Sequence, residues 1–101
     1  QTAEQMMRRI LPGSTAREVI DVSGAVGLIQ PDISNAWVGT SVGTIEERLD
    51  VRVAWISRGT SALVPHSTTI LQEHDRLHLA VATEELVAVQ RALSRPPVEE
   101  V

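Results

Sequence analysis

The chain has 101 residues, with 13 acidic and 9 basic side chains and a net charge of −4, which is the size of one small domain. It contains no Cys, Lys, Phe or Tyr, and its two aromatic side chains are Trp37 and Trp55. The lack of Cys excludes disulfides, thiol nucleophiles and cysteine-ligated metals, and the lack of Lys excludes Schiff-base chemistry. The acidic charge and aromatic poverty argue against a nucleic-acid-binding surface.

The first segment predicts a helix over residues 2–11. Thr2 is a suitable N-cap, Met6 and Ile10 share one helical face, and Pro12-Gly13 ends the pattern. We interpret residues 1–14 as a linker helix. Because the chain begins with Gln rather than Met, we expect it to be an excised piece of a longer protein.

Two short apolar runs, 17–22 and 25–30, flank Ser23-Gly24 and predict a hairpin. After a polar connection over 31–35, Thr40-Ser41 precedes apolar residues at 42, 45 and 49. This spacing predicts a capped helix of about two turns.

Strict alternation over 51–58 predicts a strand with Val51, Val53 and Trp55 on one face and the even-numbered residues on the other. Gly59 to Ser61 forms a turn to a return strand over 62–64, which Pro65 ends.

Alternation over 76–82 predicts another strand, and a final helix follows, with Thr83 as its cap and an apolar stripe at 86, 89 and 93. The element order is α-β-β-α-β-β-β-α. Since most strand connections are short, we expect an α+β fold with an antiparallel or mixed sheet.

Three patterns invite chemistry. Gly39 to Gly43 matches the G-x-S-x-G nucleophile elbow, but the chain is too short for that hydrolase fold, so a turn and helix cap is favoured over a hydrolase using Ser41. His74 and His78 stand about 13 Å apart at strand rise, so no metal site is expected. The segment 24–27 lacks the dinucleotide-binding pattern.

The hairpin over 56–66 is the remaining candidate site. Arg58 stands beside the Gly59 turn and next to small apolar residues. Arginine is suited to binding phosphate or carboxylate. The alternative interpretation is an exposed hairpin arginine with no ligand.

Four short motifs follow one another in the second half of the chain. The first, over 38–42, is a hydrophobic-Gly-x-Ser/Thr helix start, and the second, over 51–59, is a strand ending in arginine and a glycine turn. The third is a return strand with proline over 63–65 and a threonine-hydrophobic-leucine step over 69–71. The fourth, over 75–79, is an acidic turn before the last strand. Their order over 36–93 resembles the RCK C-terminal regulatory domain of potassium channels and transporters, the TrkA-C domain. Residues 6–12 and 37–39 also resemble the TrkA-type potassium-uptake subunits.

Two positions depart from that family. His74-Asp75 stands where the family usually has Gly-Asp, and Thr60 and Ser61 stand where ligand-binding relatives commonly carry Asn or Asp. We expect a local difference in the turn because histidine tolerates a left-handed backbone less well than glycine.

The resemblance implies a non-enzymatic regulatory domain over 15–95. Because Pro96-Pro97 ends the last helix, we expect a disordered tail over 96–101. It implies a cytoplasmic homodimer at the inner face of the plasma membrane that gates a potassium transporter subunit of the TrkH/TrkG type. NAD or ATP would bind a missing N-terminal Rossmann domain, and cyclic di-AMP or another nucleotide would bind this one. The expected ligand-binding residues are Ile56, Arg58, Leu63, Val64, Pro65 and His66. The alternative is a dimerisation module of another cation transporter or antiporter, without a ligand.

Overall fold

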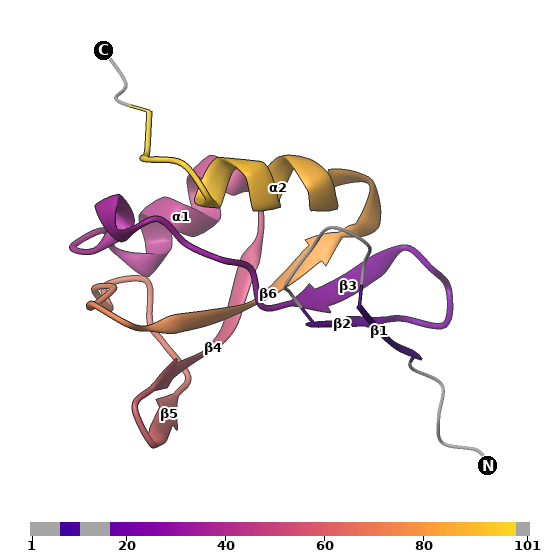
Figure 1. The fold of residues 1–101 in the computed structure, drawn as a ribbon, viewed down its shortest axis with the longest axis horizontal. Coiled ribbons are helices and arrows are strands. Elements are labelled where there is room, and N and C mark those ends of the chain that lie inside the picture. Colours follow the sequence, from indigo (N-terminus) through magenta and orange to yellow (C-terminus); the bar gives the residue numbers. More distant parts are fainter. Residues whose placement is uncertain (1–6, 11–16, 99–101) are drawn as a thin grey trace.

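The computed structural model describes residues 7–10 and 17–98, with side chains from residue 19 onward. A six-stranded sheet forms the body of this part of the chain, in the order β1-β2-β3-β6-β4-β5, and every neighbouring pair is antiparallel. The helices gather on one face of the sheet, and β5 and β1 lie at its two ends (Figure 1). The α+β prediction is therefore confirmed. The strands are β1 (Met7–Ile10), β2 (Arg17–Ile20), β3 (Val26–Ile29), β4 (Arg52–Arg58), β5 (Ser61–Leu63) and β6 (Arg76–Ala82).

The helix predicted over 2–11 is wrong where it can be examined. Met7–Ile10 forms strand β1, which pairs with β2 so that Met7 lies opposite Ile20. A short helix is marginal on its own in water, whereas a strand here satisfies its backbone groups along the edge of β2. The rest of the predicted linker lies outside the described residues, and the boundary at residue 15 stays a prediction.

The predicted first hairpin is confirmed as β2 and β3. Its turn places Gly24 at φ 79°, and the Gly24 amide donates to the Asp21 carbonyl at 2.8 Å. Glycine is the residue that adopts this left-handed backbone without steric cost. The Ser23-Gly24 pair therefore predicted this turn from its local conformational preference.

Strand β4 contains a bulge that changes which side chains face the core. Its pairing with β6 shifts register between Val53 and Trp55. As a result Val53 and Ile56, three residues apart, are both buried, and Trp55 is half-buried. The predicted face of Val51, Val53 and Trp55 is therefore wrong from Trp55 onward, because an extra residue in one strand inverts the alternation beyond it.

The first helix, α1 (Val42–Leu49), begins as predicted. The Ser41 hydroxyl accepts a hydrogen bond from the Thr44 amide at 3.2 Å, as an N-cap does. The helix ends at Asp50 in a left-handed conformation (φ 56°). Residues 39–43 therefore form a turn and helix cap, as the sequence favoured.

The last helix begins later than predicted. Thr83–Glu85 forms a 3-10 turn (η2), and α2 spans Leu86–Leu93. The Thr83 hydroxyl donates to the Gly24 carbonyl at 2.7 Å instead of capping α2. A tertiary partner thus competes successfully with the local cap, and Thr83 fastens the end of β6 to the first hairpin.

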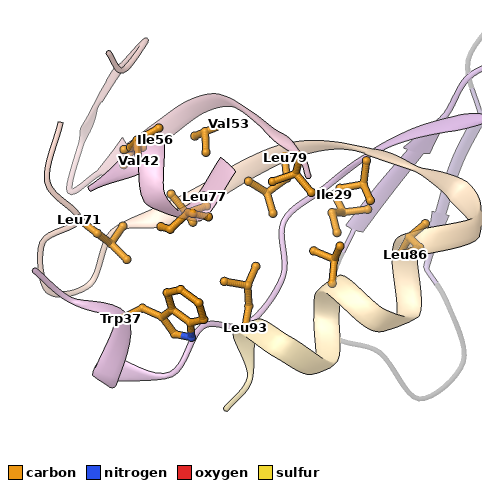
Figure 2. Close-up of a cluster of buried hydrophobic side chains, with 14 residues drawn as sticks. Ile29, Trp37, Val42, Val53, Ile56, Leu71, Leu77, Leu79, Leu86 and Leu93 are labelled. Carbon is orange, nitrogen blue, oxygen red and sulfur yellow. The ribbon is translucent and has the colours of Figure 1, made fainter. Parts of the chain in front are cut away.

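The core lies between the helices and one face of the sheet (Figure 2). Leu77 and Leu79 of β6 are fully buried, as alternation predicts, and they meet the apolar stripe of α2. Trp37, at the end of the 3-10 helix η1 (Asn35–Trp37), closes one end of this core and donates its indole N–H to the Arg95 carbonyl at 2.7 Å. Among the described residues, no helix is both long and apolar enough to cross a membrane.

Two valines on α2 test this packing. Val89 is 3% exposed and Val87 is 61% exposed. Val89→Ala should lower the free energy of unfolding by about 2 kcal/mol, since it removes buried methyl groups and leaves a cavity. Val87→Ala gives the same gain in helix propensity but should change stability by less than about 0.5 kcal/mol. Urea denaturation of both variants measures the difference, and equal effects would contradict the packing.

Candidate functional site

The β4–β5 hairpin presents the candidate arginine at its tip. Ile56 pairs with Leu63 and Arg58 pairs with Ser61 across the hairpin. Gly59 takes φ 62°, and the Ser61 hydroxyl donates to the Arg58 carbonyl at 3.2 Å. Because β5 is the last strand of the sheet, its outer edge has no strand partner among the described residues.

Arg58 forms a two-point ion pair with Asp75. Its Nε donates to Oδ1 at 2.9 Å and its Nη2 donates to Oδ2 at 2.8 Å. The Asp75 side chain is fully shielded from solvent, while the Arg58 side chain is 31% exposed. Nη2 also donates to the Ile70 carbonyl at 3.4 Å. The pair therefore holds the guanidinium plane at a fixed orientation at the molecular surface.

The electrostatics of this pair favour both charged forms. Burial alone raises the pKa of Asp75, but hydrogen bonds from Arg58 and the Gln72 amide, with the charge of Arg58, hold it below its ordinary value. The hydrogen bond to Asp75 raises the pKa of Arg58. Arg58 therefore remains a cation whose charge is largely compensated by its partner.

The turn before β6 presents the Asp75 carboxylate. The Asp75 amide donates to the Gln72 carbonyl at 3.1 Å, and the Gln72 amide donates to Asp75 Oδ2 at 2.9 Å. His74 lies between them at φ 69°, in the left-handed region. The turn thus keeps the backbone that glycine favours, with an exposed histidine in that place.

The six predicted ligand residues divide between the core and the surface. Ile56 has no exposed surface, and Leu63 packs against the core. Val64 is 78% exposed, Pro65 is half-buried and His66 is exposed. Arg58 and the 64–66 segment can therefore meet a ligand directly, whereas Ile56 supports the hairpin from below.

Two residues beside the hairpin were absent from the predicted set. Asp75 orients Arg58, and Ile70 offers an apolar side chain that is 46% exposed. An acidic turn residue immediately before a strand was the available signal for Asp75. Ile70 lies within the threonine-hydrophobic-leucine motif over 69–71, but that motif gave no sign that its side chain is exposed beside Arg58.

A second polar group lies on β4 and β6. The rings of Trp55 and His78 stack with centroids 4.1 Å apart, and the Ser57 hydroxyl lies 2.9 Å from His78 Nε2. Burial, together with the nearby charge of Arg76, lowers the pKa of His78. The neutral ring is therefore favoured, as suits a packing role on this face of the sheet.

The described residues assemble neither a serine nucleophile site around Ser41 nor a histidine metal site. The Ser41 hydroxyl is engaged with both the amide and the hydroxyl of Thr44, the latter at 2.9 Å. Within the described ranges, no group of three or more His, Asp or Glu side chains is placed to hold a metal ion.

Sequence comparison places these features in a family. Residues 30–94 match the TrkA-C domain family. The Trk system potassium uptake protein TrkA of Streptomyces coelicolor is 38% identical over 99 residues, which cover 98% of this chain and 44% of that relative. The chain therefore spans less than half the length of this curated relative. It belongs to the TrkA-C domain family.

Structural comparison agrees on the fold. The GsuK channel superposes with a TM-score of 0.65 at 22% identity, over 84% of this chain and 16% of that one. The crystal structure of the GsuK RCK domain gives 0.61 at 19% identity, over 91% of this chain and 19% of that one. The GsuK channel bound to NAD gives a TM-score of 0.59 at 20% identity, over 94% of this chain and 16% of that one. At these identities the likeness establishes a shared RCK-type fold.

The buried carboxylate makes stability depend on pH in a defined direction. Because the folded state lowers the pKa of Asp75, its ionised form adds stability above the ordinary carboxyl pKa of about 3.9. Asp75→Asn should therefore lower the free energy of unfolding by about 1–2 kcal/mol at pH 7. The deficit should shrink as pH falls below about 4, as the native carboxylate itself becomes protonated.

The matched control is Asp50→Asn, at an exposed position with a left-handed backbone that asparagine tolerates. Urea denaturation across this pH range compares the two variants with the parent. A constant deficit for Asp75→Asn at all pH values would contradict the ionised pair.

Proposed function

We propose that this chain is the regulatory C-terminal domain of a subunit of a Trk/Ktr-type potassium uptake system. The support is the TrkA-C family match and the identity to a protein named for potassium uptake. The domain would act by linkage: a ligand that binds one domain arrangement more tightly shifts the population of transporter states. A regulatory rather than catalytic role accords with this family.

The rest of the system is inferred from the same support. The subunit would be cytoplasmic and would act on a TrkH/TrkG-type membrane subunit at the inner face of the plasma membrane. NAD or ATP would bind a Rossmann domain outside this chain.

The observation that carries the ligand proposal is the anchored Arg58. A guanidinium has N–H donors in a rigid fork, and Asp75 and Ile70 engage Nε and Nη2. Nη1 makes no hydrogen bond to any described residue, so it is the group offered to a phosphate. Ile70, whose carbonyl accepts from Nη2, provides exposed apolar surface for a flat ring, and exposed Val64 follows β5 on the same hairpin. A phosphate joined to a base, as in cyclic di-AMP, combines both chemistries.

The geometry of the hairpin also favours a homodimer. The β5 edge can pair with another chain, and exposed Val64 gains from burial. A two-fold axis here would bring two copies of Arg58 to one cleft, which suits a two-fold symmetric ligand.

Calorimetry with cyclic di-AMP tests the ligand. Arg58→Ala should weaken binding by about tenfold or more, because a phosphate loses its charged donor. The matched control is Arg52→Gln, which removes one exposed positive charge from the opposite end of β4, away from the hairpin tip. Absence of binding at high micromolar ligand, or an unchanged affinity in Arg58→Ala, would overturn cyclic di-AMP as the ligand. Either result would favour the ligand-free dimerisation module.

The dimer is tested separately by light scattering and sedimentation. Val64→Asp should raise the dissociation constant of the dimer about tenfold or more, because a charge would be buried in the interface. Val22→Asp alters a similarly exposed valine in the β2–β3 turn and should leave the dissociation constant unchanged. A parent chain that stays monomeric at high concentration would contradict the interface.

A further inference from the structure

A groove lies between the C-terminal ends of α1 and α2. Figure 1 shows these two helices on the same face of the sheet. Its volume is about 480 Å³, within the range of about 300–1,000 Å³ that small-molecule sites occupy. The hairpin residues proposed above do not line it. Its lining residues are Trp37, Arg48, Leu49, Ala88, Arg91, Ala92, Arg95, Pro96 and Val98.

Positive charge converges on this groove. Arg48 comes from the last turn of α1, Arg91 from the last turn of α2 and Arg95 from the segment just after it. Among the described residues, no acidic side chain lines the groove, although the chain carries a net charge of −4. The helix dipole favours one cation at each helix end, but it does not account for like charges gathered around one hollow.

The remaining lining is apolar, and only two of its residues, both alanines of α2, are small. Ala88 and Ala92 of α2 leave the floor open, and Leu49 faces them from α1. A floor of this kind excludes water from an apolar ligand surface and makes the nearby charges more effective. The groove thus combines an apolar floor with a cationic rim.

Two hydrogen bonds hold the walls in place. Arg48 Nη1 donates to the Val98 carbonyl at 2.8 Å, which fixes the segment after α2 across the groove. The Trp37 indole N–H donates to the Arg95 carbonyl, which fixes the backbone that carries the third arginine. A ligand would therefore meet a largely formed site and lose less free energy to ordering.

We propose that this groove binds a small organic anion, in which a carboxylate or phosphate is attached to an apolar body. The arginine rim takes the anionic group and the alanine floor takes the body. This is a second ligand site, independent of the hairpin, so either proposal can fail without the other.

Fluorescence titration with anilinonaphthalene sulfonate, an apolar dye carrying one anionic group, tests the site in the full chain. The double variant Arg91→Gln/Arg95→Gln should weaken binding about tenfold or more, and added salt should weaken binding to the parent. The uncharged dye N-phenylnaphthylamine should bind the parent more weakly than the sulfonate. Circular dichroism checks that the variant remains folded.

Two controls locate the effect. Arg76→Gln removes a positive charge from the opposite face of the sheet, since the buried residues of β6 alternate with it. Val22→Asp alters an exposed valine in the β2–β3 turn, outside both proposed sites. Both should leave dye affinity unchanged. Equal binding of the two dyes, equal affinity in the double variant, or no sulfonate binding below millimolar concentration would each overturn the proposal.

Discussion

The burial of alternate side chains of β6 is the constraint on which the rest of the fold depends. Leu77, Leu79 and Val81 lie at most 2% exposed beneath the two helices. β6 is also hydrogen-bonded to a strand on each side, β3 and β4. Because the side-chain period of a strand is two, a register shift of one residue would expose these three side chains to solvent. The row therefore fixes the register of the central sheet and the face on which the helices pack.

Residues at the two ends of β6 connect the central sheet to the candidate site and to α2. At its start, Asp75 holds Arg58 and so ties the hairpin tip to the central strand. At its end, Thr83 bonds to the first hairpin and leads into α2. A shielded carboxylate requires its partner, since losing Arg58 would leave a charge without compensation. The hairpin arginine thus has a structural role and an exposed donor at the same time.

Local patterns predicted the central and C-terminal parts of the fold well. The Ser41 cap, the glycine turns and the alternation of β6 each depend on short-range geometry, which the sequence contains. The misses depend on long-range partners. The β4 bulge is defined only by its pairing with β6, and Thr83 finds a partner 59 residues away. Strand β1 exists because β2 offers an edge, which no periodicity of the segment itself reveals.

The same limit applies to the sites. Arg58 stood out because a glycine turn follows it, but its anchor Asp75 lies 17 residues further along the chain. The arginine groove gave no local signal, because its rim joins a residue of α1 to residues near the end of α2. The hairpin and the family resemblance placed Ile56 in the expected ligand set, whereas the bulge turns its side chain into the core.

The two candidate anion sites differ in how they would recognise a ligand. Arg58 is paired with a shielded carboxylate, so its net field is small and it selects by the direction of its remaining donors. The described lining of the groove has three arginines and no carboxylate, so it would attract anions through charge. Dissolved salt weakens the attraction between an anion and unpaired surface charges more than it weakens a directed hydrogen bond from a shielded ion pair. Binding at the groove would therefore respond strongly to ionic strength, whereas binding at the hairpin would respond weakly.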